Sequence, residues 1–299
     1  MTWNFELAAG PYACALGGVA PLGDAVVFSA VTDNKIIHLD AAGNTFDWRR
    51  FTSRTNGLAE GPDGLIYGCQ EASRRVCEFH PDGTTAVAAT KLDGKYHNHP
   101  SDAVVDHAGS VWFCDPHNAM PAFGPQMFPP LPFAAVLRAS RGPTHRWGME
   151  RLTYDTAHPR AIALSPDENT LYVAEGSTAP GTLRELRAYP VNADGSLGQP
   201  RVLMTFGADV RGAHRGIEGL CVDSDGFVIA CGGCRRSGAG ALVYVFSPGG
   251  AVVQAHELPD DMPMRCAFGG GARDVLYVTT GTGNVWRASA TGRKGLSRF

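Results

Sequence analysis

Residues 165–173 read SPDENTLYV, a Ser-Pro-Asp turn signal followed by a run of β-favouring residues. The same order recurs along the chain, for example as PDGLIYGC in residues 62–69 and SDGFVIAC in residues 224–231. Six such apolar runs begin at Val26, Leu65, Val111, Leu171, Phe227 and Leu276, in steps of 39, 46, 60, 56 and 49 residues. The chain therefore contains a weak internal repeat of short strands.

Steps of this size are typical of four-stranded propeller blades joined by loops of variable length. No stretch shows a sustained apolar period of 3.6 residues, so we expect helices to be minor. The sequence predicts an all-β protein, a six-bladed β-propeller with four-stranded antiparallel blades around a central channel. We expect residues 1–299 to form one propeller domain.

Composition limits the classes of partner. The 299 residues carry a formal net charge of −3, which predicts neither nucleic acid nor an anionic membrane as a partner. The first ten residues, MTWNFELAAG, lack the basic and apolar regions of a secretory signal. We expect a cytoplasmic protein, a monomer or homodimer, that acts on a small molecule. A cytosolic location would keep its eight cysteines reduced.

A second repeated element lies about ten residues before each apolar run, where one residue precedes small and apolar positions. Its six first residues are Leu16, Asn56, Ser101, Arg160, Glu218 and Arg265. The innermost strands of a propeller line its channel, so equivalent positions form a ring at the channel mouth. We expect these six side chains to meet in one pocket.

Several ordered stretches resemble the gluconolactonase, regucalcin and luciferin-regenerating enzyme family of six-bladed propellers. The matching stretches are residues 56–58 (NGL), 69–76 (CQEASRRV), 93–98 (DGKYHN), 113–116 (FCDP), 165–173 and 266–270 (CAFGG). The resemblance implies hydrolysis of lactones or related esters, assisted by one divalent cation, Ca²⁺ or Zn²⁺, at the channel mouth.

The positions that the resemblance assigns to the cation carry unsuitable residues. Leu16 stands for a Glu, Ser101 for an Asn, Arg160 for an Asn and Glu218 for an Asp. Hard cations need several oxygen ligands and net negative charge. An arginine side chain has no oxygen ligand to offer, and its positive charge repels a cation. We therefore expect no metal and no cofactor in this site.

Arginines offer a replacement for the missing positive charge. Arg160 and Arg265 can bind a carboxylate or an oxyanion, because guanidinium groups stay charged and bind oxygen in a forked geometry. Glu218 is the candidate general acid or base. The alternative is an Arg160–Glu218 ion pair that only plugs the channel.

The segment Tyr96-His97-Asn98-His99 lies where the resemblance places an Arg-x-Asn substrate clamp. Asn98 matches the Asn, while Tyr96 replaces the Arg. We expect His99 to act in the pocket, and Glu71, which follows a strand, to reach the same rim. His97 and His99 would share a face in a strand, so a zinc site at this pair is an alternative.

Two further features have competing interpretations. Cys114 or Cys231 would be a nucleophile only beside a base such as His117 or His99, and otherwise is an inert thiol. Cys231 and Cys234 have metal-knuckle spacing without a second pair, which favours two thiols at a strand end. Residues 117–134, rich in Pro, Met and Phe, are predicted to be a lid over the channel; the alternative is a loop packed on a neighbouring blade or a second subunit.

The sequence thus predicts a lactonase-like hydrolase acting on a small lactone or carboxylate-bearing substrate without the usual metal. The predicted catalytic residues are Glu218, Arg160 and His99, and the predicted substrate-binding residues are Asn56, Asn98, Ser101, Arg265, Leu16 and Glu71. The alternatives are a metal-independent isomerase, lyase or condensing enzyme that uses Glu218, and a non-catalytic small-molecule binding propeller.

Overall fold

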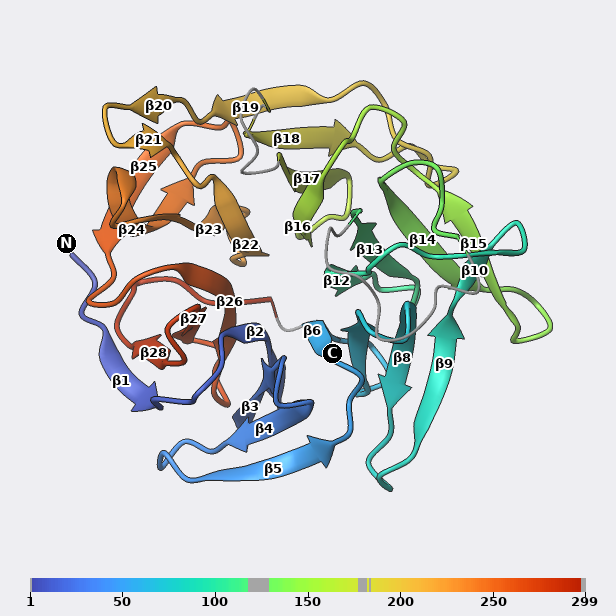
Figure 1. Cartoon of the computed structure of the whole chain (residues 1–299), viewed down its shortest axis with the longest axis horizontal. Coiled ribbons are helices and arrows are strands. Elements are labelled where there is room, and N and C mark those ends of the chain that lie inside the picture. Colours follow the sequence, from blue (N-terminus) through green and yellow to red (C-terminus); the bar gives the residue numbers. More distant parts are fainter. Residues whose placement is uncertain (1, 118–128, 177–181, 183, 297–299) are drawn as a thin grey trace.

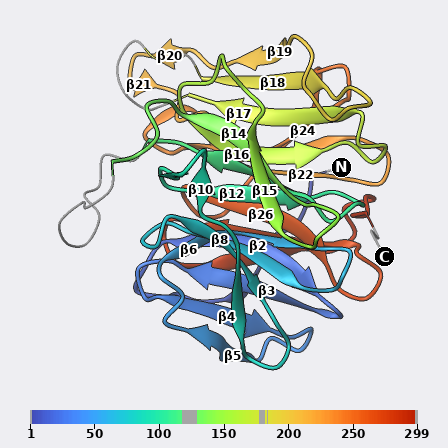
Figure 2. The same cartoon turned by 90° about the vertical axis from the view of Figure 1, so that its right-hand side faces the viewer.

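The computed structural model describes residues 2–117, 129–176, 182 and 184–296. Within these residues the chain forms strands, turns and loops but no helix, and six four-stranded antiparallel sheets stand around a common centre (Figure 1; side view in Figure 2). The predicted six-bladed β-propeller is therefore confirmed.

The strands follow one another from the centre outward in each of the first three blades. Blade 1 contains β2 (Leu16–Leu22), β3 (Ala25–Ala30), β4 (Lys35–Leu39) and β5 (Thr45–Arg50). Blade 2 contains β6 (Thr55–Glu60), β7 (Ile66–Gln70), β8 (Arg75–Phe79) and β9 (Thr85–Ala89). Blade 3 contains β12 (Asp102–Val105), β13 (Val111–Asp115), β14 (Ala135–Arg141) and β15 (Trp147–Arg151).

Blades 4 and 5 repeat this order, and blade 6 closes the ring. Blade 4 contains β16 (Pro159–Leu164), β17 (Thr170–Glu175), β18 (Glu185–Pro190) and β19 (Arg201–Thr205). Blade 5 contains β22 (Ile217–Val222), β23 (Val228–Cys234), β24 (Ser237–Phe246) and β25 (Val252–Glu257). Blade 6 contains β26 (Pro263–Gly269), β27 (Val275–Thr280), β28 (Val285–Ala288) and, paired with β28, the N-terminal strand β1 (Glu6–Ala9).

Two short hairpins lie outside the blades. They are β10 (Lys91–Leu92) with β11 (Lys95–Tyr96), and β20 (Ala208–Asp209) with β21 (Gly212–Ala213). The β10–β11 hairpin leads into the segment that precedes β12, and the β20–β21 hairpin precedes β22. Both hairpins therefore lie just before an inner strand.

The repeated apolar runs of the sequence are the second strands of the blades. Strands β3 and β13 have every residue buried, because each blade is covered on both faces by its neighbours. The buried apolar residues fall into six clusters, one at each interface between adjacent blades. Burial between blades explains why these strands read as continuous apolar runs rather than alternating ones.

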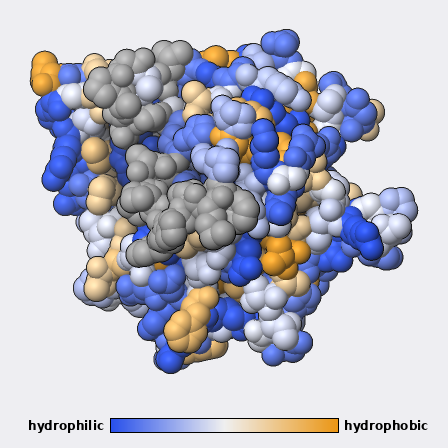
Figure 3. Space-filling view, turned by 45° about the vertical axis from the view of Figure 1, so that its right-hand side comes forward, coloured by the Kyte–Doolittle hydropathy of each residue, from blue (hydrophilic) through white to orange (hydrophobic). Residues whose placement is uncertain are grey.

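Most of the outer surface is polar. The face seen in Figure 3 is largely hydrophilic, with hydrophobic residues scattered in small groups. No helix in the described part of the chain has the length and apolar character needed to cross a membrane.

Candidate functional site

Five of the six inner strands, all except β12, share a local irregularity that aims side chains at the channel. In β16, β22 and β26 the pairing with the next strand skips one residue, which is Arg160, Glu218 and Met264 respectively. A β-bulge of this kind re-aims the bulged side chain, and such bulges are common next to active sites. In β6 the skipped residues are Asn56 and Gly57.

Two of the six expected ring positions need correction. In β2 the skipped residues are Gly17 and Gly18, whereas Leu16 pairs regularly with Ala30 and is buried in the core of blade 1. Leu16 therefore does not line the pocket, and Gly17 takes its place in the ring. A Cβ atom at Gly17 would lie 2.7 Å from Asn56 Oδ1, so the ring has no room for a side chain there.

Arg265 also lies one residue away from the ring position that the sequence predicted for it. It pairs with Thr279 one residue beyond the bulge, at the level of Asp102 rather than of Glu218. Met264 holds the ring position in blade 6, and Arg265 reaches the pocket from below.

A polar pocket of about 220 Å³ lies at this mouth of the channel. Its lining includes the predicted residues Asn56, Glu71, His99, Ser101, Arg160, Glu218 and Arg265, together with Pro116, His117, His158 and Met264. We call this space the polar pocket. Of the described residues that line it, only Pro116 and Met264 contribute apolar side chains.

Glu218 is the carboxylate of the polar pocket that lies beside two arginines, Arg160 and Arg215. Its side chain is only 3% exposed, and its Oε2 accepts hydrogen bonds from Nε (3.0 Å) and Nη2 of Arg160. Arg215 Nε lies 3.3 Å from Oε1 without forming a hydrogen bond. Arg160 Nη1 has no hydrogen-bond partner among the described residues and remains available to a ligand.

The floor of the polar pocket is a second ion pair that crosses the channel. Arg265 Nε lies 3.3 Å from Asp102 Oδ1, and Arg265 Nη2 donates to the main-chain oxygens of Ser101 and Arg160. The main chain of β26 runs so close to β22 that residue 219 must be glycine, because a Cβ there would lie 2.6 Å from Arg265 Cα. Arg265 thus closes the channel below the ring and adds positive charge to the pocket.

Several buried polar atoms on the pocket wall have no hydrogen-bond partner among the described residues. They are Asn56 Oδ1, His99 Nδ1, Ser101 Oγ and Glu218 Oε1. Buried polar atoms are nearly always hydrogen-bonded, so four orphans around one cavity indicate a polar ligand or ordered water. Glu71 faces them, accepting a 2.7 Å hydrogen bond from Asn56 Nδ2, and burial raises the pKa of its carboxyl group.

Two histidines of the polar pocket, His99 and His158, are held in the neutral form. Burial lowers the pKa of His99, and burial together with Arg160 lowers the pKa of His158 to about 4. At neutral pH each imidazole therefore offers one acceptor and one donor nitrogen.

Asn98 and His97 lie outside the polar pocket. Asn98 is fully buried and donates to the main-chain oxygens of Asp115 and Phe133, so it fixes the course of the chain instead of facing a ligand. His97 is also fully buried and stacks on Phe113. Since β11 ends at Tyr96, His97 and His99 do not alternate along a strand, and they do not share a face.

The environment of His97 gives a testable pH dependence. Neither ring nitrogen forms a hydrogen bond within the described part of the chain, and burial lowers the pKa of His97 to about 3. The unfolded chain binds the proton near pH 6.5 and the folded chain does not, so His97 costs stability as the pH falls below 6.5. In urea titrations, His97→Phe should improve the unfolding free energy relative to wild type by about 2 kcal/mol more at pH 5 than at pH 7. Equal differences at the two pH values would contradict a neutral buried imidazole.

The cysteine alternatives receive little support from the geometry. Cys114 and Cys231 are fully buried in blade interfaces, and burial raises the pKa of both thiols well above its usual value. A buried thiol of raised pKa is a poor nucleophile. Cys234 lies at the end of β23 near Ser237.

The central part of the predicted lid, residues 118–128, lies outside the described residues. In the part that follows, Leu131 packs into the cluster between blades 2 and 3.

Sequence reasoning missed His158, Met264 and the role of Arg215. His158 immediately precedes β16 and Arg215 lies two residues before β22, so both stand just upstream of a ring residue. Proximity to a ring position was the available signal. His117, considered only as a partner for a cysteine, lines the pocket itself.

The pocket residues do not fit a divalent metal. Of the ring positions only Glu218 supplies a carboxylate, and two guanidinium groups already contact it. Among the described residues, no three His, Cys, Asp or Glu side chains are grouped so that they could share a metal ion. These guanidinium groups oppose the net negative charge that a Ca²⁺ site requires.

Comparison with known proteins gives consistent results. Residues 18–282 match the family model described as the SMP-30/gluconolactonase/LRE-like region. A gluconolactonase of Zymomonas mobilis is 26% identical over 217 residues, which cover 72% of this chain but only 58% of that relative. A gluconolactonase structure from Xanthomonas campestris is 25% identical, with a TM-score of 0.79 over 96% of this chain and 89% of the other. The calcium-binding protein regucalcin of Agrobacterium tumefaciens, 16% identical with a TM-score of 0.74 over 98% and 96% of the two chains, shares the fold.

Proposed function

Because the chain belongs to the SMP-30/gluconolactonase/LRE-like family, we propose that it hydrolyses a small lactone in the polar pocket, with the Arg160 guanidinium in the role that the family resemblance gives to a divalent cation. The observation that carries the proposal is the group of buried polar atoms around Arg160 and Glu218 that form no hydrogen bond within the described part of the chain. A hydroxylated lactone supplies donors and acceptors for such atoms.

The chemistry divides between two side chains. Arg160 Nη1 donates to the lactone carbonyl oxygen and stabilises the negative charge that develops on it. Glu218 Oε1 accepts the proton of a water molecule as that water attacks the carbonyl carbon. The tetrahedral intermediate then expels the ring oxygen, which takes the proton back from Glu218, and the product is an open-chain hydroxy acid.

The remaining pocket residues orient the substrate. Asn56 and Ser101 offer hydrogen bonds to substrate hydroxyl groups, and neutral His99 accepts or donates according to its tautomer. Arg265 adds positive charge beneath the product carboxylate. A site built to bind hydroxyl groups discriminates strongly against substrates without them.

The experiment is a lactone-hydrolysis assay on protein treated with a chelator. We expect release of acid from five- or six-membered sugar lactones at a rate that changes less than about twofold after removal of divalent cations. Arg160→Met should reduce kcat/KM by about a hundredfold or more, as for the loss of an oxyanion donor. Arg211→Met, which removes an exposed arginine paired with Asp209, is the control.

Two outcomes would overturn the proposal. Loss of most activity on chelation, restored by Ca²⁺ or Zn²⁺, would contradict the metal-independent mechanism. A rise in Tm with sugar acids but no turnover of any lactone would identify a binding protein instead.

A further inference from the structure

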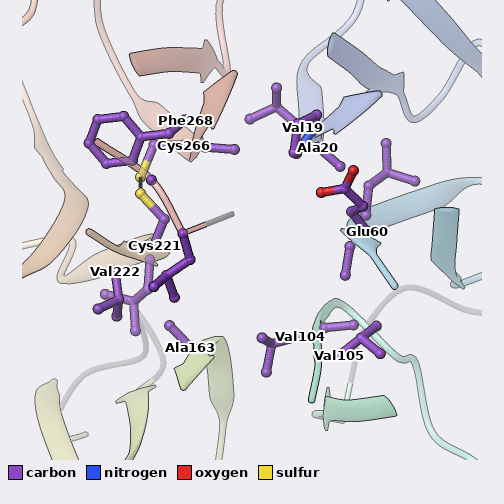
Figure 4. A pocket seen from close by; sticks show the side chains of 18 of the residues that line it. Val19, Ala20, Glu60, Val104, Val105, Ala163, Cys221, Val222, Cys266 and Phe268 are labelled. Carbon is purple, nitrogen blue, oxygen red and sulfur yellow. Dashed lines mark hydrogen bonds between the residues drawn. The ribbon is translucent and has the colours of Figure 1, made fainter. Parts of the chain in front are cut away.

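A second pocket lies at the other end of the channel. It has a volume of about 140 Å³ and is separated from the polar pocket by the Arg265–Asp102 pair. Its wall is mainly small and apolar, including Val19, Ala163 and Phe268 (Figure 4). We call this space the apolar pocket.

Two cysteines from adjacent blades meet on the wall of the apolar pocket. Cys221 Sγ of β22 lies 3.5 Å from Cys266 Sγ of β26, and Figure 4 shows the two sulfur atoms pointing at one another. The two residues are 45 positions apart in the chain. Cys221 is partly exposed, whereas Cys266 is 5% exposed.

From this juxtaposition we infer that Cys221 and Cys266 form a reversible disulfide that joins blades 5 and 6, with hydrogen peroxide as the class of oxidant. The thiolate of Cys266 attacks one peroxide oxygen, giving a sulfenic acid and hydroxide. Cys221 then attacks the Cys266 sulfur, the S–S bond forms and water leaves. The hydroxide released in the first step takes up a proton and becomes a second water molecule. In total, two thiols are oxidised to one disulfide and one peroxide is reduced to two water molecules.

Three features of the surroundings favour this pair. The apolar pocket gives a small uncharged oxidant a route to both sulfur atoms. Hydrogen bonds from Cys221 and Cys231 lower the pKa of Cys266, which increases its thiolate fraction. The sulfur atoms need to approach by only about 1.5 Å to reach bonding distance.

The linkage is detectable by mass spectrometry. Reduced protein is treated with hydrogen peroxide, free thiols are alkylated, and the chain is cut after arginine and before aspartate. The cut at Asp223 separates Cys221 from Cys231 and Cys234, so the expected product is peptide 216–222 joined to peptide 266–273. This product should disappear on treatment with a dithiol reductant.

Stability gives a second readout. A crosslink that closes a loop of this length should raise Tm by about 5 °C in the oxidised wild type. Cys221→Ala should lose both the linked peptide and the rise in Tm. Cys231→Ala, which removes the other thiol beside Cys266, should keep both. Complete alkylation of Cys221 and Cys266 after peroxide treatment, or a link from Cys266 to Cys231, would overturn the inference.

Discussion

Glu218→Gln is expected to reduce kcat for lactone hydrolysis by about a thousandfold, while KM changes only a few-fold. Gln has nearly the same shape as Glu but does not take up the proton of the attacking water. The Oε1 atom that lacks a hydrogen bond is the one that we assign to this water. Substrate contacts from Asn56, Ser101 and His99 stay in place, so binding persists.

A matched control comes from the opposite end of the channel. Glu60 also pairs with an arginine, Arg273, at 2.8 Å, but its side chain is 15% exposed against 3% for Glu218, and it lines the apolar pocket. Glu60→Gln should leave kcat and KM unchanged. If Glu218→Gln retains more than a tenth of wild-type kcat, the Arg160–Glu218 pair is a structural plug and the general-base role is wrong.

The fold could be predicted because its signals are local. Turn residues and apolar runs recur at each second strand, and the burial of those strands between blades depends only on their composition. The bulges were not predictable in the same way. A bulge inserts one residue without changing the residue types around it, so the spacing placed Leu16 and Arg265 one position away from the ring residues Gly17 and Met264.

The candidate site was only partly visible for a related reason. Ring residues such as Asn56 and Glu218 open the repeated element, whereas His158 and Arg215 stand two and three residues before it. His158-Pro159-Arg160 repeats the order of His99-Pro100-Ser101, and this likeness between blades 3 and 4 was the available signal for His158. The prediction for His97 and His99 assumed an extended strand. The main-chain nitrogen of Asn98 instead bonds to Asp115, and the chain turns there.

The Arg265–Asp102 pair should be the most sensitive point of the structure. Arg265→Met leaves Asp102 buried without its cation, and we expect a loss of about 3–5 kcal/mol in the unfolding free energy at pH 7. Burial already raises the pKa of Asp102 to about 6 despite Arg265. Ionisation of Asp102 therefore costs stability increasingly as the pH rises from about 3.8 to about 6 and in full above that, and part of the loss in Arg265→Met should be regained as the pH falls and Asp102 becomes protonated.

A double-mutant cycle separates the charge from the packing. Asp102→Asn together with Arg265→Met removes both charges. This double variant should be at least about 2 kcal/mol more stable than Arg265→Met alone. The reason is that removing both members of a buried ion pair is far less costly than removing one of them. Arg211→Met, at the exposed pair with Asp209, should change stability by less than about 0.5 kcal/mol. Urea unfolding of wild type, Asp102→Asn, Arg265→Met, the double variant and Arg211→Met at pH 5 and 7 measures all these differences. Should Arg265→Met prove no more damaging than Arg211→Met, the ion pair does not hold the pocket floor, and the inner strands alone must close the channel.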